Sequence, residues 1–165
     1  MNLKTICIII SVLTISVLAL GCTGNDSLKG SAEPVEATWI SPMISEDTVS
    51  IPVEAVDKDT NVHFKVNTGT GELAVMAYSL DDKISIRSSV CPPCGSLGFA
   101  LDGSTLICDT CATTFDASTG MGIEGACVAY PKESIPYTVS GGNLTMQLDD
   151  IMNAHQETLK MNPGS

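Results

Sequence analysis

Stretches in which apolar and polar residues alternate recur from residue 48 onward, with turn residues between them. A period of two is typical of β-strands that bury one face. It predicts strands over residues 48–53, 62–66, 84–87, 97–101, 105–107, 113–116, 135–139 and 143–148. Residues 72–78 are more continuously apolar and are predicted to form a buried strand, whereas only the tail, at about residues 149–161, has helical character. The expected fold class is all-β: a small antiparallel β domain with a short C-terminal helical tail.

Two local signals add detail to this pattern. Pro52 lies in the first predicted strand, and because proline lacks the N–H that a central strand donates, it predicts an edge position. Asp102-Gly103-Ser104 is a turn signal between the runs 97–101 and 105–107. These two runs are therefore predicted to form a hairpin.

Two Cys-x-x-Cys pairs flank that hairpin, Cys91 with Cys94 before it and Cys108 with Cys111 after it. Each pair places two thiols on one tight turn, here called a knuckle, and the hairpin can return the second knuckle to the first. Four thiolates can then converge on one tetrahedral point, as they do in zinc and iron–sulfur sites. The spacing predicts a metal or iron–sulfur centre bound by these four cysteines. Disulfide staples and a redox-active dithiol are the alternatives.

A further cysteine, Cys127, makes the number of cysteines in the predicted domain odd. It is interpreted as a buried thiol, as an additional ligand near the centre, or as a disulfide partner. The spacing of the other four leaves the metal open, because zinc, mononuclear iron and iron–sulfur clusters all bind such cysteines.

The N-terminal residues have the pattern of an export signal, with a basic start at Lys4, an apolar run over residues 6–20, and Gly21 before Cys22. The sequence Leu-Ala-Leu-Gly-Cys that ends at Cys22 resembles the lipobox at which prokaryotic cells cleave the signal and attach lipid to the cysteine. An uncleaved transmembrane anchor is the alternative, but the run is shorter than the ~20 residues that span a bilayer.

This reading divides the chain into four parts. We expect a signal peptide over residues 1–21 and a flexible tether, which starts at the lipidated Cys22, over residues 22–41. A metal- or iron–sulfur-binding β domain is expected over residues 42–150 and a tail over residues 151–165. The protein is then expected at the cell membrane, lipid-anchored and facing outside the cytoplasm.

Charge and composition exclude some classes of function for this protein. The chain has 19 acidic and 8 basic residues, a net charge of −11, and such a surface repels nucleic acid and anionic lipid headgroups. Because aromatic residues make up only 4% of the chain, the core must be built from aliphatic side chains, and a bound metal would add to its stability. The sequence has no Ser/His/Asp arrangement and no phosphate-binding loop, which favours an electron carrier over a substrate-converting enzyme.

The order of these motifs resembles the FtrD-like family of membrane iron–sulfur proteins over about residues 48–146. The resemblance runs through VHFKV, GELAVMAYSLDDKISI, the two cysteine pairs and the later segment GIEGACVAYP. Residue by residue it reaches Cys91, Cys94, Gly98, Phe99, Gly103, Cys108, Cys111 and Phe115. Around Cys127 the chain reads Gly-Ala-Cys-Val where the family pattern has Gly-Gly-Cys-Asn-Pro, which leaves the role of this cysteine open.

A remoter resemblance is to Rieske-type domains. The segment that starts at Leu106 is similar to the second cluster loop and closing hairpin of these proteins, with Cys111 where a Rieske histidine stands. Neither His63 nor His155 lies near a knuckle in sequence, and His63 is expected on a strand away from the loops. The resemblances thus imply a [2Fe–2S] cluster with cysteine ligands alone, and zinc or mononuclear iron is the alternative. An all-thiolate cluster is expected at a lower potential than a Rieske centre.

Together the resemblances imply an electron-transfer function. The expected protein is a lipid-anchored, exported iron–sulfur domain that exchanges electrons with a membrane-bound redox or transport partner, with a link to an iron uptake system and no nucleic-acid partner. The alternative is a structural zinc-binding interaction domain of a lipoprotein, because Cys-Pro-x-Cys-Gly is also a zinc-ribbon knuckle.

Overall fold

Twelve strands and two short helices make up the part of the chain that the structure describes, residues 33–69 and 71–161 of a computed structural model. The predictions for the signal peptide and for Cys22 lie outside these residues. Within the described residues, no helix has the length and apolar character needed to cross a membrane.

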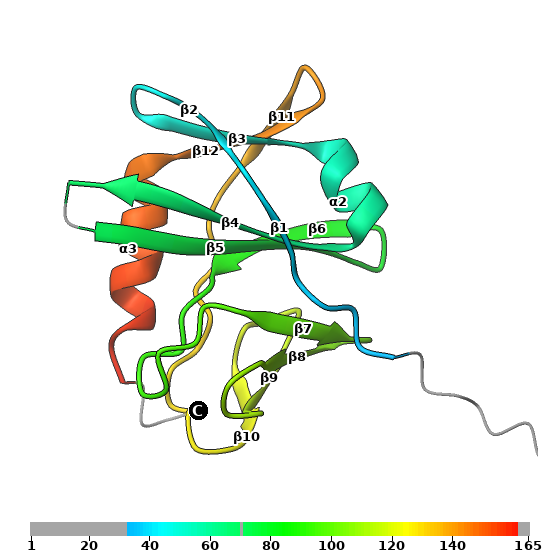
Figure 1. Ribbon diagram of the computed structural model, residues 1–165, viewed down its shortest axis with the longest axis vertical. Helices are drawn as coiled ribbons and strands as arrows, with labels where there is room; N and C mark the ends of the chain where they lie inside the picture. Colours follow the sequence, from blue (N-terminus) through cyan, green and yellow to red (C-terminus); the bar gives the residue numbers. More distant parts are fainter. Residues whose placement is uncertain (1–32, 70, 162–165) are drawn as a thin grey trace, which may run out of the picture. The chain divides into compact units, whose positions relative to one another are not determined.

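The strands form three four-stranded sheets, and the sheet β1-β4-β5-β6 lies between the other two (Figure 1). This middle sheet comprises β1 (Thr38–Ile40), β4 (Asn61–Thr68), β5 (Gly71–Leu80) and β6 (Lys83–Ser88). The second sheet, in the order β10-β9-β8-β7, comprises β7 (Phe99–Asp102), β8 (Thr105–Cys108), β9 (Thr114–Asp116) and β10 (Gly122–Glu124). The third, in the order β11-β12-β3-β2, comprises β2 (Met43–Ser45), β3 (Thr48–Pro52), β11 (Thr138–Ser140) and β12 (Asn143–Gln147). The helices are α2 (Val53–Asp59) and α3 (Leu148–Thr158).

The predicted all-β class and the C-terminal helix are confirmed. All strand pairs are antiparallel except β1 with β4. The predicted hairpin is also present, with Asp102 opposite Thr105 and with Gly103 at a φ of 55° in the two-residue turn between them. That positive φ favours glycine, because a Cβ would crowd the backbone.

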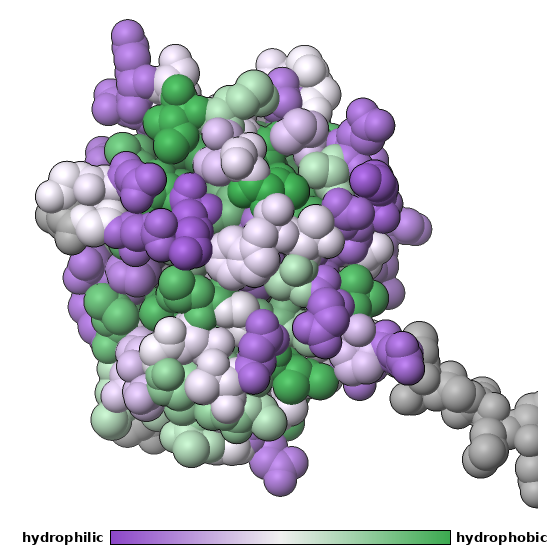
Figure 2. All heavy atoms as spheres, viewed as in Figure 1, coloured by the Kyte–Doolittle hydropathy of each residue, from purple (hydrophilic) through white to green (hydrophobic). Residues whose placement is uncertain are grey.

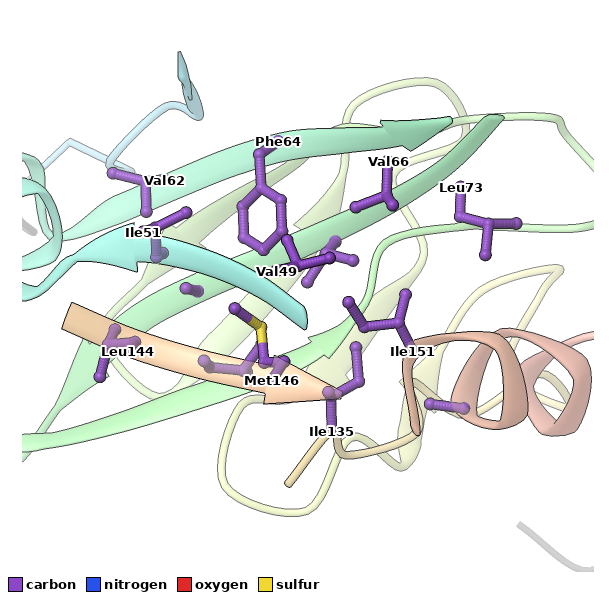
Figure 3. Packing of buried hydrophobic residues seen from close by; sticks show 14 of the residues in the cluster. Val49, Ile51, Val62, Phe64, Val66, Leu73, Ile135, Leu144, Met146 and Ile151 are labelled. Carbon is purple, nitrogen blue, oxygen red and sulfur yellow. The ribbon is translucent and has the colours of Figure 1, made fainter. Parts of the chain in front are cut away.

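Strand β5 is buried on both faces and separates two cores. Val75 and Ala77 point into the first core, between the middle sheet and the strands β3 and β12, which α3 closes on one side (Figure 3). Met76 and Tyr78, on the opposite face of β5, point into a second core that also contains the knuckle cysteines. We call this second group the cysteine core. Since successive side chains of a strand alternate between faces, a continuous apolar run is what such a shared strand requires.

The prediction of an edge strand at Pro52 is wrong, because β3 lies between β12 and β2. Strand β2 pairs only with Thr48 to Ser50, whereas β12 continues to a pair between Asn143 and Pro52. The proline therefore lies past the end of β2, where its missing N–H leaves no carbonyl of that strand unpaired.

Regular structure begins before residue 42, where the domain was expected to start. Val35 exchanges two backbone hydrogen bonds with Leu101, at 2.7 and 2.9 Å, and β1 then pairs with β4. At the other end, α3 runs across the expected boundary at residue 150, since Ile151 and Ala154 pack into the first core.

Candidate metal centre

The two knuckles are presented by the ends of two strands. Strand β6 ends at Ser88 and leads directly into Cys91, whereas Cys108 is the last residue of β8. The hairpin of β7 and β8 thus connects the knuckles in the way predicted from the turn signal at Gly103. Figure 1 shows this part of the chain on one side of the middle sheet, opposite β2, β3 and β12.

The knuckles share one backbone hydrogen-bonding pattern. In the first, the Cys91 N–H donates to the carbonyl of Ser96 at 2.8 Å, and the Gly95 N–H donates back to the Cys91 carbonyl at 2.8 Å. In the second, the Cys108 N–H donates to Thr113 at 2.9 Å, and the Ala112 N–H donates to Cys108 at 2.9 Å. The two Cys-x-x-Cys turns are therefore the same structure built twice, although only their cysteines agree in sequence.

Each turn closes through a residue with positive φ, Gly95 at 73° and Ala112 at 54°. Glycine adopts this region freely, whereas alanine does so at a cost of about 1–2 kcal/mol. The second knuckle is held in this conformation by its surroundings, which are the strands β8 and β9 and the buried side chain of Thr113.

Five sulfur atoms gather where the knuckles meet. The Sγ atoms of Cys91, Cys94, Cys111 and Cys127 all lie within 4.8 Å of one another. Cys108, which the sequence also predicts as a ligand, is outside that group of four, but its Sγ lies 3.7 Å from Cys94 Sγ. All five are free thiols. The structure thus brings together the four predicted cysteines and places Cys127 beside them.

Cys127 reaches the centre by close packing against the second knuckle. Its N–H donates to Thr113 Oγ1 at 3.2 Å, and the same oxygen lies 3.2 Å from Cys111 Sγ. Cys127 Sγ is in turn 3.7 Å from Cys111 Sγ. A Cβ on Gly125 would come within 2.6 Å of Thr113 Oγ1, so this approach requires glycine there. The sequence signals for this placement are the odd number of cysteines in the domain and the partial match around Cys127 to the family's Gly-Gly-Cys segment.

The thiols differ in burial and in acidity. Cys91, Cys108 and Cys127 are buried, whereas Cys94 and Cys111 are half-buried and lie on the solvent side. Burial raises the pKa of Cys91 and of Cys108. Burial also acts to raise the pKa of Cys111, but hydrogen bonds with Thr113 and with neighbouring thiols outweigh it and lower that pKa to about 6. Because metals bind thiolates, Cys111 is more ready to bind a metal at neutral pH than Cys91 or Cys108.

Aromatic rings and two buried cations line the inner side of the centre. Phe99 and Phe115 meet edge to face, with ring centroids 5.9 Å apart. The ammonium of Lys132 lies 4.4 Å from the Phe115 centroid, and the Arg87 guanidinium donates to Tyr78 Oη at 2.9 Å. The sequence pattern indicates neither cation, because Lys132 is far in sequence from both knuckles and Arg87, although close to Cys91, belongs to no ligand motif.

His63 is nearer to the first knuckle than predicted. It lies on β4, as expected, but its Nδ1 is 3.3 Å from the Leu97 carbonyl and 3.2 Å from Ser89 Oγ. Ser89 Oγ also donates to Leu97 at 2.7 Å. The expectation that His63 lies away from the loops is therefore wrong, because β4 pairs with β5 next to β6, which leads into the knuckle. Burial lowers the pKa of His63 to about 4, so the ring is neutral at neutral pH.

The donor set fits a metal ion or an iron–sulfur group. Two thiolates on one tetrahedral ion lie about 3.8 Å apart when each metal–sulfur bond is about 2.3 Å, and the Cys94–Cys108 and Cys111–Cys127 pairs are both at 3.7 Å. Thiolates are the usual ligands of zinc and of iron–sulfur clusters. Two of the cysteines are partly exposed to solvent and three are buried. A metal ion or cluster bound by them would therefore lie between the protein interior and the surface.

Known proteins resemble the chain at two levels. A solved structure described as a complex of reduced oxygenase and oxidized ferredoxin in carbazole 1,9a-dioxygenase contains a chain that is 17% identical, with a TM-score of 0.51. The match covers 63% of this chain and 95% of that one, and it confirms the expected remote fold likeness to Rieske-type domains. The ferredoxin of Sphingomonas yanoikuyae B1 is 20% identical, with 58% of this chain and 92% of that chain covered and a TM-score of 0.48. No curated protein matches the chain in sequence.

The family-level comparison is more specific. The model of the family described as membrane iron–sulfur containing protein FtrD-like matches residues 55–157, which is more than half of the chain and includes both knuckles and Cys127. The resemblance expected from the motif order is thereby confirmed, and the chain belongs to the FtrD-like family of membrane iron–sulfur containing proteins.

Proposed function

We propose that this protein is a lipid-anchored, exported electron carrier that binds a [2Fe–2S] cluster through cysteine ligands. The observation that carries the proposal is the convergence of five free thiols from two matching knuckles and one further loop. Membership of a membrane iron–sulfur family supports it. When bound, such a cluster supplies one-electron chemistry.

We propose the four knuckle cysteines as the ligands, as the spacing predicts: Cys91, Cys94, Cys108 and Cys111. The identical hydrogen bonds of the two knuckles support this choice, because they give Cys108 the same backbone setting as Cys91. Cys127 is the candidate for a fifth, replacement ligand, since its sulfur is 3.7 Å from that of Cys111.

The protein covers the proposed cluster on its inner side and leaves its outer side accessible to a redox partner. Cys94 and Cys111 are the half-buried thiols and mark the side through which electrons enter and leave. Phe99 and Phe115, both fully buried, exclude water from the opposite side.

The partner is proposed to be a membrane-bound redox or transport component, with a link to iron uptake. An exposed apolar residue in the same sheet as the second knuckle supports a protein partner: Ile123, on β10, is 57% exposed, and β10 pairs with β9. On the face in Figure 2, strongly hydrophilic residues are fewer over the part that contains β7 to β10 than over the other two sheets. Apolar contact of this kind is typical of the centre of a docking surface.

A structural zinc module is the second candidate. Sulfur pairs at 3.7 Å also suit one tetrahedral zinc ion. Such an ion would stabilise the cysteine core, because it would tie together thiols from different segments of the chain. The protein would then act through an interaction surface and not through electron transfer.

Metal analysis distinguishes the two candidates. The full-length protein, isolated from membranes without exposure to oxygen, is assayed for iron, acid-labile sulfide and zinc, and its visible spectrum is recorded. The electron-carrier proposal requires iron and sulfide in equal amounts and charge-transfer absorption. Stoichiometric zinc in a colourless protein that contains no iron rejects it in favour of the zinc module.

Single cysteine-to-serine variants then assign the ligands. Cys108→Ser is expected to lose the iron, whereas Cys127→Ser is expected to retain it. The reverse result would replace Cys108 by Cys127 in the ligand set.

A further inference from the structure

Lys132 is a lysine whose side chain is completely enclosed. Its relative exposure is 0%, and its ammonium donates to the Val90 carbonyl at 2.7 Å, one residue before Cys91. The same nitrogen lies 4.4 Å from the centroid of Phe115 and 5.3 Å from that of Phe99. Lysine is almost never fully buried in proteins unless an anion pairs with it.

No carboxylate pairs with Lys132 among the residues that the structure describes. The three ion pairs found there involve Lys58, Lys65 and Lys160, which all lie on the surface. The absence is informative because acidic residues outnumber basic ones by 19 to 8 in this chain. In so acidic a chain, a lysine on the surface could readily pair with a carboxylate. Lys132 is instead buried between aromatic rings.

Thiols are the groups that can supply the missing negative charge. The rings of Phe99 and Phe115, which flank the ammonium, pack in the cysteine core with Cys91, Cys108 and Cys127. Burial lowers the pKa of Lys132 to about 8, and the charges of these three cysteines and of Cys94 oppose that decrease. Thus the enclosed cation and the predicted ligands act on one another electrostatically.

The backbone fixes Lys132 in this position. Its carbonyl accepts a hydrogen bond from Arg87 Nη1 at 2.9 Å, and its N–H donates to Gly120 at 2.8 Å. A Cβ on Gly120 would come within 2.2 Å of the Lys132 carbonyl oxygen, so only glycine allows this contact. Arg87 also donates to the carbonyls of Ser118 and Thr119, which ties the surrounding loop to the same point.

We propose that Lys132 is the internal countercharge of the thiolate site and sets the reduction potential of the group that the cysteines bind. This inference rests on the proposed function. One electron, taken from a reduced one-electron carrier, adds one negative charge to the thiolate-bound group, with no proton transferred and no covalent bond formed or broken. The fixed positive charge of Lys132 favours the more negative state and therefore raises the potential. Arg87 is a positioning residue, because it acts through the backbone of Lys132.

The test removes the charge in two ways. Lys132→Gln is neutral but still carries an N–H donor, one bond closer to the backbone than the ammonium, and Lys132→Met removes the donor as well. Lys65→Gln is the matched control, since Lys65 also lies over an aromatic ring, 5.6 Å from the centroid of Trp39, but is exposed and paired with Glu72. Midpoint potentials of the full-length proteins are measured by redox titration, and thermal unfolding shows whether each variant is folded.

Both Lys132 variants are expected to shift the redox equilibrium at least tenfold towards the oxidised form, which is a fall of 59 mV for one electron. Lys65→Gln is expected to leave the potential unchanged. A merely structural role would lower the unfolding temperature without moving the potential. Equal potentials in the wild type and in a folded Lys132→Gln variant overturn the inference.

A second readout separates this inference from the proposed function. Cobalt(II) is titrated into the metal-free proteins, because a four-thiolate cobalt site is also anionic and needs the same countercharge. Lys132→Gln is expected to bind cobalt at least tenfold more weakly than the wild type and Lys65→Gln. If the wild type contains zinc and no iron, the electron-carrier proposal fails, and the cobalt titration alone decides the role of Lys132. Equal cobalt affinities in that case overturn the inference.

Discussion

At the scale of single residues, the two knuckles differ in the residue with positive φ that closes each turn, which is Gly95 in the first and Ala112 in the second. Gly95 and Ala112 both have positive φ, and only the alanine bears a Cβ. A Cβ on Gly95 would meet nothing within 4 Å, so its cost would come from the backbone alone. The first knuckle therefore requires glycine because of the positive φ at this position, and not because a side chain would collide with neighbouring atoms.

We predict that Gly95→Ala lowers the free energy of unfolding by about 1 kcal/mol, because the left-handed region disfavours a side chain. The same change should speed the loss of iron from the protein. Gly141→Ala is the matched control, since Gly141 has a φ of 56° and equally open surroundings in the distant turn between β11 and β12. Urea unfolding and iron retention are measured for both. Equal iron loss in the two variants would contradict the account.

His63 is one residue that couples stability to pH. Burial lowers its pKa to about 4, against about 6.5 in the unfolded chain, so below pH 6.5 the unfolded state binds a proton that the folded state excludes. Stability is therefore lost as the pH falls from about 6.5 towards 4, by up to about 3 kcal/mol from this group. In His63→Gln this part of the pH dependence should disappear. Urea unfolding of both proteins at about pH 7 and at about pH 4.5 checks it, and equal losses would show that His63 contributes nothing.

At the scale of elements, β5 links the scaffold to the candidate centre, because its two faces belong to two cores. We predict that Met76→Ala and Met146→Ala each destabilise the protein by about 2–5 kcal/mol, since both methionines are almost completely buried. Met76 faces the cysteine core, whereas Met146 lies in the first core. Only Met76→Ala is therefore expected to accelerate iron loss at matched stability, which absorbance decay measures. Equal rates of iron loss in the two variants would show that the two faces of β5 do not differ in their effect on the metal centre.

Alternation predicted the longer elements, because each has enough residues to show a period of two. This holds for β4 and β6 and for the hairpin of β7 and β8, whereas β5 was predicted from its continuous apolar run. The elements missed were α2 and the three-residue strands β1, β2 and β10. Three residues are too few to define a period, and β1 forms only by parallel pairing with β4, which is set by the tertiary structure. Helix α2 buries one residue deeply, Val56, and so shows no apolar face in sequence.

At the scale of the whole molecule, the sequence predicted the convergence of the knuckle cysteines better than the surroundings of these cysteines. The knuckle cysteines could be predicted because their ligand spacing is local. Lys132 and Val90 are 42 positions apart, and nothing in either segment indicates that they meet. Cys127 was identified as a candidate, but its contact with Thr113 depends on the close approach of Gly125.

Cys22 determines where the molecule is expected to act. We predict that Cys22→Ala releases the protein from the membrane fraction or leaves its signal uncleaved, because the variant cannot receive lipid. Fractionation and intact mass of the wild type and of the variant check this, with Cys7→Ala as the control inside the apolar run. A membrane-bound wild type that retains Met1 would contradict cleavage at Cys22.

An EPR-monitored redox titration of the full-length protein, isolated anaerobically from iron-replete cells, tests the proposed iron–sulfur cluster most directly. We expect a one-electron iron–sulfur signal with a midpoint nearer the roughly −400 mV of plant-type ferredoxins than the roughly −150 to +300 mV of Rieske centres. The midpoint should also vary little with pH around neutrality, because no histidine ligand titrates. A silent, colourless protein with bound zinc would contradict the account, and so would a pH-dependent midpoint in the Rieske range.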